Sequence, residues 1–193
     1  MPQRELWLIR HGETEWSRTG QHTGAADIAL TAVGEAQAIA LKIALDGQAF
    51  ARILVSPLRR AVQTCELAGY SPVAIPTPDL REWNYGQYEG LTSAQIQADR
   101  PGWSIWKDGP RGGETIAEVG VRAQRVLDSL PETAGPVALF AHGHILRILT
   151  AVWLGLPPDA ARLFALSTGS ISILGYEHSV RVIRGWNRVP PPV

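Results

Sequence analysis

The sequence is poor in cysteine and lysine, carries no net charge and has no long hydrophobic run. Its 193 residues include one cysteine, Cys65, which excludes an internal disulfide and is typical of a protein of the reducing cytoplasm. Acidic and basic residues number 18 each, so there is no basic excess with which to bind nucleic acid or an anionic membrane. No apolar run is long enough to cross a bilayer, and residues 1–5 lack the apolar core of a signal peptide. We therefore expect a cytoplasmic protein with no nucleic-acid partner and no membrane association.

The composition is that of a globular protein. Hydrophobic residues make up 45% of the chain and charged residues 19%, which favours a large packed core over disorder. A length of 193 residues favours one domain. Nearly all basic residues are arginines, which suit the recognition of oxyanions, although the codon usage of a GC-rich genome accounts for most of them.

Short apolar runs alternate with helical patterns along the chain. Strands buried on both faces are predicted at residues 6–9, 53–55 and 137–141. Helices, with apolar residues spaced three and four apart, are predicted at residues 31–45, 56–69, 115–130 and 145–154. Weaker patterns indicate a helix at 92–98 and strands at 73–75, 170–176 and 180–186. Residues 14–30 are expected to form a long polar loop.

This alternation of strands and helices predicts an α/β fold. We expect a three-layer α/β/α sandwich with a mostly parallel central sheet, formed by a single domain over residues 1–193. Residues 76–113 are dense in Trp, Tyr, Gly and Pro, and we interpret them as a lid or substrate-specificity segment. Of the three tryptophans in it, Trp83, Trp103 and Trp106, two are expected to pack within the segment rather than line a pocket. Ser56 is expected to cap the helix at 56–69.

Polar side chains follow three of the predicted strands where each strand ends. They are Arg10-His11, Ser56 with Arg59 and Arg60, and His142-Gly143-His144. Because the carboxyl ends of parallel strands meet at one edge of a sheet, these groups should converge there. Arginines and histidines without clustered Asp or Cys favour an oxyanion ligand over a metal ion. Among oxyanions, this much positive charge favours phosphate over a carboxylate.

An imidazole beside arginines suggests nucleophilic catalysis. Neutral histidine can attack phosphorus to form a phosphohistidine while cations hold the phosphoryl oxygens. An acid must then protonate the leaving alkoxide and later activate water. Five carboxylates are candidates, and spacing alone does not choose among Glu13, Glu15, Asp27, Glu82 and Glu89.

Four sequence blocks carry a more specific signal. They are Leu-Ile-Arg-His-Gly-Glu-Thr at 8–14, Ser-Pro-Leu-Arg-Arg-Ala-Val-Gln-Thr at 56–64, Arg81-Glu82 with Gly86 and Glu89-Gly90, and Ala-His-Gly at 141–143. In this order, and over nearly the whole chain, they resemble the histidine phosphatase superfamily, also called phosphoglycerate-mutase-like. The resemblance implies a metal-independent enzyme without a cofactor that acts on small phosphorylated metabolites.

The resemblance also implies roles for individual residues. It implies that His11 is the phosphorylated nucleophile and Glu82 the proton donor. The phosphate pocket would be formed by Arg10, Arg60 and His142. Substrate contacts would come from the side chains of Ser17, Tyr85 and His144 and the backbone amides of Thr23 and Gly24. Ser17 stands where many family members have Asn.

Further blocks point to a subgroup. Residues 16–24, 82–92, 106–109 and 113–115 are similar to fungal sedoheptulose-1,7-bisphosphatases and to bacterial acid phosphatases. The chain lacks the long insertion of cofactor-dependent mutases, so we favour hydrolysis of phosphomonoesters, such as sugar phosphates or bisphosphates, over mutase activity. Phosphoglycerate mutase, a protein phosphatase and a non-catalytic phosphate-ligand-binding module stay as alternatives, and the oligomeric state is left open, with a homodimer as one option.

Overall fold

Six strands form one mixed sheet in the computed structural model, which describes residues 5–130 and 135–191. The order is β3-β2-β4-β1-β5-β6, with β1 at Leu6–Arg10, β2 at Arg52–Val55, β3 at Ala74–Pro76, β4 at Val137–Ala141, β5 at Ile171–Glu177 and β6 at Val180–Arg188. Strands β1 to β4 run parallel to one another, whereas β5 and β6 are antiparallel additions at one edge. The expectation of a mostly parallel sheet is confirmed.

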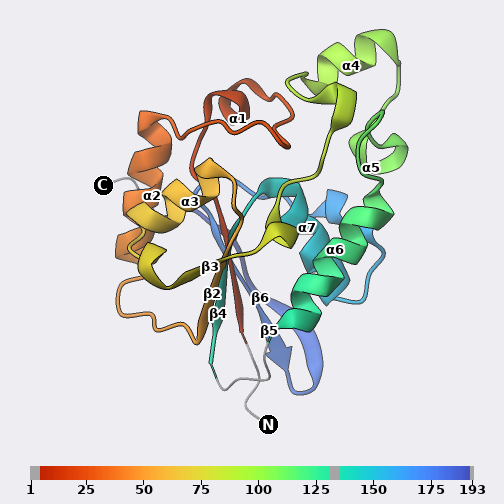
Figure 1. Cartoon of the computed structure of the whole chain (residues 1–193). Helices are drawn as coiled ribbons and strands as arrows, with labels where there is room; N and C mark the ends of the chain where they lie inside the picture. Colours follow the sequence, from red (N-terminus) through yellow and green to blue (C-terminus); the bar gives the residue numbers. More distant parts are fainter. Residues whose placement is uncertain (1–4, 131–134, 192–193) are drawn as a thin grey trace.

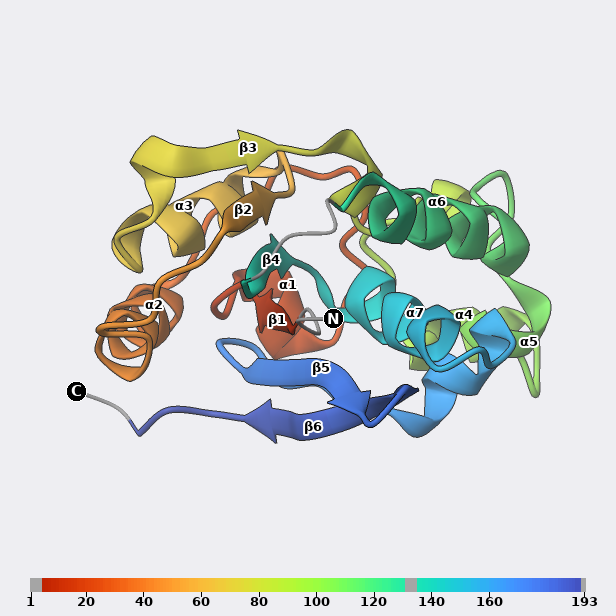
Figure 2. The same cartoon turned by 90° about the horizontal axis from the view of Figure 1, so that it is seen from below.

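Helices cover both faces of this sheet. Figure 2 shows α2 (Ala32–Ala44) and α3 (Arg59–Leu67) on one face, and α6 (Ile116–Ser129) and α7 (Gly143–Trp153) on the other. The predicted three-layer sandwich is therefore confirmed. None of the helices in the described part of the chain combines the length and the apolar character needed to span a bilayer.

The remaining helices are short. Figure 1 shows α1 (Glu15–Thr19) above the carboxyl ends of the parallel strands, and α4 (Ser93–Asp99) and α5 (Ile105–Asp108) on the same side of the molecule. Single 3-10 turns complete the chain: η1 at Ser71–Val73, η2 at Pro78–Leu80, η3 at Gly86–Tyr88 and η4 at Pro158–Leu163.

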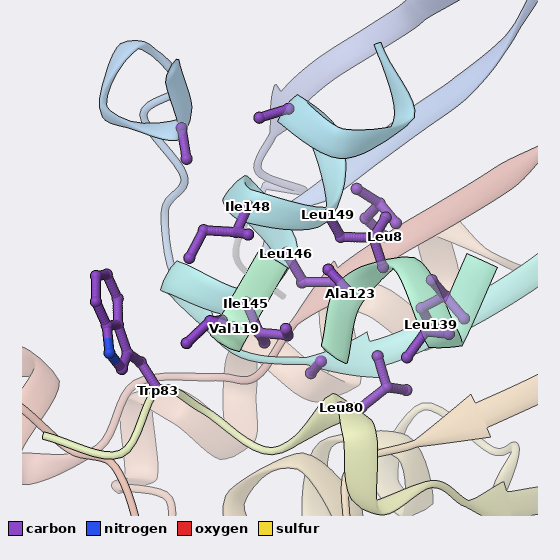
Figure 3. Close-up of a cluster of buried hydrophobic side chains, with 14 of the residues drawn as sticks. Leu8, Leu80, Trp83, Val119, Ala123, Leu139, Ile145, Leu146, Ile148 and Leu149 are labelled. Atoms are coloured by element: carbon purple, nitrogen blue, oxygen red, sulfur yellow. The ribbon is translucent and has the colours of Figure 1, made fainter. Parts of the chain in front are cut away.

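The core strands are apolar on both faces because helices cover both. In β1, Leu6 and Leu8 pack into the cluster under α6 and α7, whereas Ile9 packs into the cluster under α2 and α3. The first cluster is seen in Figure 3, where Leu8 and Leu139 of the sheet lie beside Ala123 and Leu149 of the helices. Each such buried side chain contributes about 1.5–3 kcal/mol to stability. Burial on both faces therefore holds the strands firmly in place, and with them the residues that follow their ends.

Two local expectations are wrong, and both lie near the strand ends. The segment 14–30 is not all loop, because the Thr14 and Ser17 side chains form a capping box that begins α1. Ser56 does not cap α3, which begins at Arg59. Instead, the Asp27 side chain accepts a hydrogen bond from the Arg59 amide at 2.7 Å, so a distant carboxylate satisfies the helix terminus and leaves the Ser56 hydroxyl for another partner.

The loop after β1 is held against α2 by backbone-to-backbone packing. A Cβ atom at Gly12 would lie 2.3 Å from the carbonyl oxygen of Gly34, and a Cβ atom at Gly34 would lie 2.1 Å from that of Glu13. Neither contact tolerates a side chain. This packing holds the segment that carries His11 at the strand end.

We expect Gly34→Ala to lower the free energy of unfolding by about 1–3 kcal/mol, because the added methyl group has only backbone to displace. Denaturant unfolding measures the effect. Val33→Ala at the neighbouring exposed position is the control, with an expected change within about 0.5 kcal/mol. Equal stability of the two variants would contradict the close packing.

Candidate active site

A cavity of about 310 Å³ opens where β1 and β4 end. Of the ten residues predicted for the site, seven line it: Arg10, His11, Ser17, Thr23, Glu82, Tyr85 and His144. The other three do not line it: Arg60 and His142 are fully buried, and Gly24 lines a second cavity that also touches Glu82. The convergence predicted from the strand ends is therefore present in the structure.

The His11 side chain is buried, and among the described residues only one of its two ring nitrogens has a hydrogen-bond partner. Its Nδ1 lies 2.7 Å from the carbonyl oxygen of Gly12, which can only accept, so Nδ1 carries the proton and Nε2 has the lone pair. Burial, reinforced by the positive charges of Arg60 and Arg10, holds the pKa of His11 well below its ordinary value. The imidazole is therefore neutral near pH 7, as a nitrogen nucleophile must be.

His142 lies beside His11, with ring centroids 5.2 Å apart, and is also neutral. Burial, followed by the charge of Arg60, holds its pKa well below the usual range. Its Nδ1 accepts a hydrogen bond from Arg60 Nε at 3.1 Å, so the proton is on Nε2, which donates to the Ser56 hydroxyl at 2.7 Å. Sequence reasoning missed this use of Ser56, because the two residues are 86 positions apart.

The Arg60 guanidinium ties a distant loop to this pair. Besides donating to His142, it donates through Nη1 to the carbonyl of Ala26 at 2.8 Å. Its Nη2 donates to the carbonyls of Thr23 and Gly24 at 2.9 and 3.0 Å. Arg60 is fully buried, and this environment lowers its pKa from the usual value, although a guanidinium stays charged.

Arg10 provides a cation directly at the cavity. Its Nη1 donates to the carbonyl of Leu166, and its buried Nε has no hydrogen-bond partner among the described residues. A Cβ atom at Gly143 would lie 3.4 Å from the Arg10 Nε and Cζ, so the guanidinium packs against the backbone at the start of α7. Arg10 lines the cavity, and an arginine at a cavity is suited to bind an anion.

Glu82 is the one of the five candidate carboxylates that lines the cavity. Its Oε1 accepts from the amides of Trp83 and Ile145 at 2.9 and 3.0 Å, and its Oε2 accepts from the amide of His144 at 3.0 Å. The carboxylate thus caps α7, whose N-cap residue His142 makes no side-chain capping bond. Oε2 accepts one hydrogen bond and so retains a lone pair.

The other four carboxylates have other functions in the fold. Glu13 accepts from the Thr31 hydroxyl, and Glu15 pairs with Arg18 on the surface. Asp27 caps α3. The Glu89 carboxylate accepts from two loop amides, those of Gly24 and Ala26.

Tyr85 and His144 form a hydrogen-bonded pair on the cavity wall. Burial raises the pKa of Tyr85 well above its ordinary value, so its hydroxyl is protonated, and it shares a hydrogen bond of 2.6 Å with His144 Nδ1. Burial and the charge of Arg147 hold the pKa of His144 well below the usual range. His144 is therefore neutral.

The loop residues expected to contact substrate differ in whether they line the cavity and in which of their polar groups are already hydrogen-bonded. Ser17 and Thr23 line the cavity, and the Ser17 hydroxyl also donates to the carbonyl of Thr14. The amide of Gly24, expected to face substrate, instead donates to Glu89 Oε1 at 2.8 Å. Gly24 therefore contributes its carbonyl to Arg60 and no amide to this cavity.

Nine further residues line the cavity beyond the predicted set, and His22, Trp106 and Arg147 are among them. Trp83 and Trp103 are buried in the core, so the expectation that two of the three tryptophans pack is confirmed, and Trp106 is the one at the cavity. Arg147 is one helical turn after Gly143 on α7, a spacing that could have indicated it. Within residues 5–130 and 135–191, no group of three or more His, Cys, Asp or Glu side chains is placed to hold a metal ion.

Comparison with known proteins gives consistent matches over nearly the whole chain. The model of the histidine phosphatase superfamily (branch 1) matches residues 6–189. An acid phosphatase of Mycobacterium tuberculosis is 38% identical over 97% of this chain and 95% of its own. Sedoheptulose 1,7-bisphosphatase of Saccharomyces cerevisiae is 34% identical over 77% and 67%, and a probable phosphoglycerate mutase of Yersinia enterocolitica is 36% identical over 94% and 89%.

The fold agrees with a solved structure of a functionally characterised open reading frame of Mycobacterium tuberculosis. The TM-score is 0.91 at 36% identity, covering 97% of this chain and 99% of that one.

The hydrogen bond between Ser56 and His142 can be tested on stability. Ser56→Ala leaves the buried Nε2–H of His142 without an acceptor, and we expect the free energy of unfolding to fall by about 1–3 kcal/mol. Ser71→Ala, which removes an exposed hydroxyl, is the control and should change it by no more than about 0.5 kcal/mol. A loss at Ser56 no larger than in the control would contradict the tautomer assigned to His142.

Proposed function

The chain belongs to the histidine phosphatase superfamily, and on that premise we propose that it hydrolyses phosphomonoesters of small metabolites through a phosphohistidine on His11. One observation carries the proposal: buried, neutral His11 has Nδ1 bonded to Gly12 and therefore keeps the lone pair on Nε2, in a cavity that also holds the Arg10 guanidinium. The phosphatase names of two relatives support hydrolysis, and sugar bisphosphates are among the substrates to test.

In the first step, His11 Nε2 attacks phosphorus and the bond from phosphorus to the ester oxygen breaks. The protonated Glu82 carboxyl donates its proton to the departing alkoxide, which leaves as an alcohol. Arg10 stabilises the phosphoryl oxygens on which charge is spread in the transition state. Arg60 adds its positive charge from outside the cavity lining and bonds to His142, whose ring lies next to His11.

In the second step, water attacks the phosphohistidine. The Glu82 carboxylate takes a proton from this water as the bond from phosphorus to nitrogen breaks, which returns His11 to its neutral form and Glu82 to its acid form. Inorganic phosphate is released. The free lone pair on Glu82 Oε2 and its fixed position at the start of α7 support this double use.

Mutase activity is the second candidate, because a relative named as a probable phosphoglycerate mutase is 36% identical. A mutase must return the phosphoryl group to substrate before water reacts with it. A binding module without turnover is the third candidate, and the presence of both His11 and Glu82 at one cavity argues against it.

Three finer assignments are also proposals. Residues 76–113 contribute Ile105 and Trp106 to the cavity, which supports their interpretation as a specificity segment of a single domain. The buried single cysteine supports a cytoplasmic location. A homodimer stays a prediction.

His11→Ala should abolish phosphate release and the acid-labile phosphoenzyme, because no other group is placed to form that bond in the proposed mechanism. Glu82→Gln should slow turnover by about 10²–10⁴-fold and let the phosphoenzyme accumulate, because the amide cannot transfer the proton. Both are measured with a panel of sugar bisphosphates and 3-phosphoglycerate in EDTA.

The control for Glu82→Gln is Glu66→Gln, which alters an exposed carboxylate of α3 and should keep full activity. Activity of His11→Ala near that of the unmodified enzyme would refute the mechanism. Interconversion of phosphoglycerates without phosphate release would favour the mutase.

The pKa of His11 gives a prediction on pH. We expect the His11 imidazole to stay neutral down to a pH well below 6.5, because burial and the charges of Arg60 and Arg10 disfavour its protonation. Arg10→Gln removes one of these charges and should shift the protonation of His11 to higher pH. NMR titration of histidine-labelled enzyme measures the shift, with exposed Arg59→Gln as the control. A His11 titration that is unchanged, or moved to lower pH, would contradict the assigned electrostatics.

A further inference from the structure

The loop between η4 and β5 carries the acceptor that holds Arg10. Among the described residues, the Arg10 side chain makes one hydrogen bond, from Nη1 to the Leu166 carbonyl. The backbone at Gly143 packs against the same guanidinium, with a Cβ position 3.4 Å from Nε and Cζ. An arginine grips an oxyanion through a planar fork, so its use at the cavity depends on how that plane is turned. The position of the Leu166 carbonyl therefore sets the orientation of this cation.

Two consecutive residues of β6 hold the loop on either side of Leu166. Trp186 Nε1 donates to the Ala165 carbonyl at 2.5 Å. The Ser167 amide donates to Asn187 Oδ1 at 2.7 Å, and Asn187 Nδ2 donates to the Ser167 hydroxyl at 3.3 Å. This part of the chain is neither helix nor strand, so side chains supply the partners that a regular ladder would otherwise provide.

A β-bulge makes this double contact possible. The register of β5 against β6 shifts between Ile171 and Ile173, where Trp186 and Asn187 together oppose Ser172. In a regular strand, consecutive side chains point to opposite faces. Here Asn187 has a left-handed φ of 53°, and its amide donates to the Ser172 hydroxyl at 2.9 Å. The bulge thus lets both side chains reach the same loop.

Asparagine suits this position for two reasons. It adopts the left-handed conformation more readily than most residues do, and its amide side chain both accepts and donates hydrogen bonds. Among the described residues other than glycine, His178 is the one that shares a positive φ with Asn187. His178 lies in the turn between β5 and β6, at the end of the sheet away from the cavity, and offers a matched control.

We propose that Asn187 is a positioning residue for Arg10, because it fixes the loop whose Leu166 carbonyl orients the guanidinium at the phosphoryl-binding end. The inference rests on the proposed phosphatase function and adds to it a residue that acts without touching the substrate. Asn187 is not among the residues that line the cavity. Its effect passes from the bulge to Ser167, from there to the neighbouring carbonyl, and from the carbonyl to Arg10.

Asn187→Gly separates the side chain from the backbone. Glycine adopts a positive φ freely, so the bulge can persist while the hydrogen bonds to Ser167 are lost. We expect the affinity for vanadate, an anion resembling the transferred phosphoryl group, to fall by about tenfold, and kcat/KM for the best ester of the panel to fall with it, since small displacements of a binding group are costly. Calorimetry measures the first quantity and phosphate release the second.

Two variants serve as controls. Asn187→Asp keeps an acceptor for the Ser167 amide and tolerates the backbone conformation, so both quantities should stay within about threefold of the unmodified enzyme. His178→Gly makes the same kind of change at the same φ in the same hairpin, and it should alter neither quantity. Denaturant unfolding of all three variants reports stability separately, because a purely structural role would lower stability and leave the vanadate affinity of the folded protein unchanged.

A double-mutant cycle shows whether the effect passes through Arg10. In an Arg10→Gln background, Asn187→Gly should lower vanadate affinity by less than about twofold further, because the group that it positions is gone. Losses that multiply would place the action of Asn187 elsewhere and overturn the inference.

The remaining outcomes are equally decisive. Unchanged vanadate affinity in Asn187→Gly, or equal losses in the Gly and Asp variants, would overturn the inference. If Asn187→Gly does not fold, Trp186→Phe removes the hydrogen bond to the Ala165 carbonyl and keeps a ring in place. It should lower vanadate affinity by about threefold or more, and an unchanged value would overturn the inference. Vanadate binding needs no turnover, so these results are distinct from the failure of the proposed function, which would appear as no hydrolysis of any ester by the unmodified enzyme.

Discussion

The buried guanidinium of Arg60 is the contact on which the rest of the candidate site depends. It joins α3 to the loop at residues 23–26 through three carbonyl oxygens and to the end of β4 through His142. Burying a cation costs several kcal/mol unless its donors find acceptors, so the loop must close over it as it does. The same contact has a chemical consequence. Because Arg60 donates to His142 Nδ1, this nitrogen cannot carry a proton, and the adjacent charge also disfavours protonation of His11. One side chain thus holds the loop in place and, together with burial, keeps both histidines neutral.

Glu82 joins structure and chemistry in the same way at α7. Its side chain accepts hydrogen bonds from the amides of His144 and Ile145 at the start of the helix. The amides of the helix hold the Glu82 carboxyl group in one position, and the proposed proton transfer requires such precise placement. The same helix carries His144 and Arg147 on its cavity face. One helix therefore holds the proposed proton donor, Glu82, in a fixed position relative to His144 and Arg147 at the same cavity.

The sequence predicts the parts of this site that depend on local order, and it fails for those that depend on long-range contacts. Arg10 and His11 follow a strand that must be buried, so their place at the sheet edge comes from pattern alone. Ser56 illustrates the limit: the Ser-Pro pair is a good helix start, but Asp27 satisfies the terminus of α3 and releases the hydroxyl to His142. The choice of Glu82 among five carboxylates likewise depends on how residues 76–113 cross to α7, which no local spacing encodes; only the family resemblance identified it. Arg147 was missed because a helical arginine is usually solvated, and the crossing of α5 over α7 is what places Trp106 against it.

The two halves of the cavity differ in how strongly the fold constrains them. In the phosphoryl half, nearly every polar group has a second function: Arg60 closes a loop, Glu82 caps a helix and Ser56 satisfies a buried imidazole. Changing any of these residues alters stability and chemistry together. The rest of the cavity is lined by ring faces and by the Arg147 guanidinium, which uses only some of its donors, so substitutions there leave fewer buried groups unsatisfied. Selection for a new leaving group can therefore act on residues such as His22, Trp106 and Arg147 without disturbing the transfer of the phosphoryl group. It follows that what the protein does to a phosphoester and which phosphoester it selects are separable properties of the structure, because different sets of contacts maintain them.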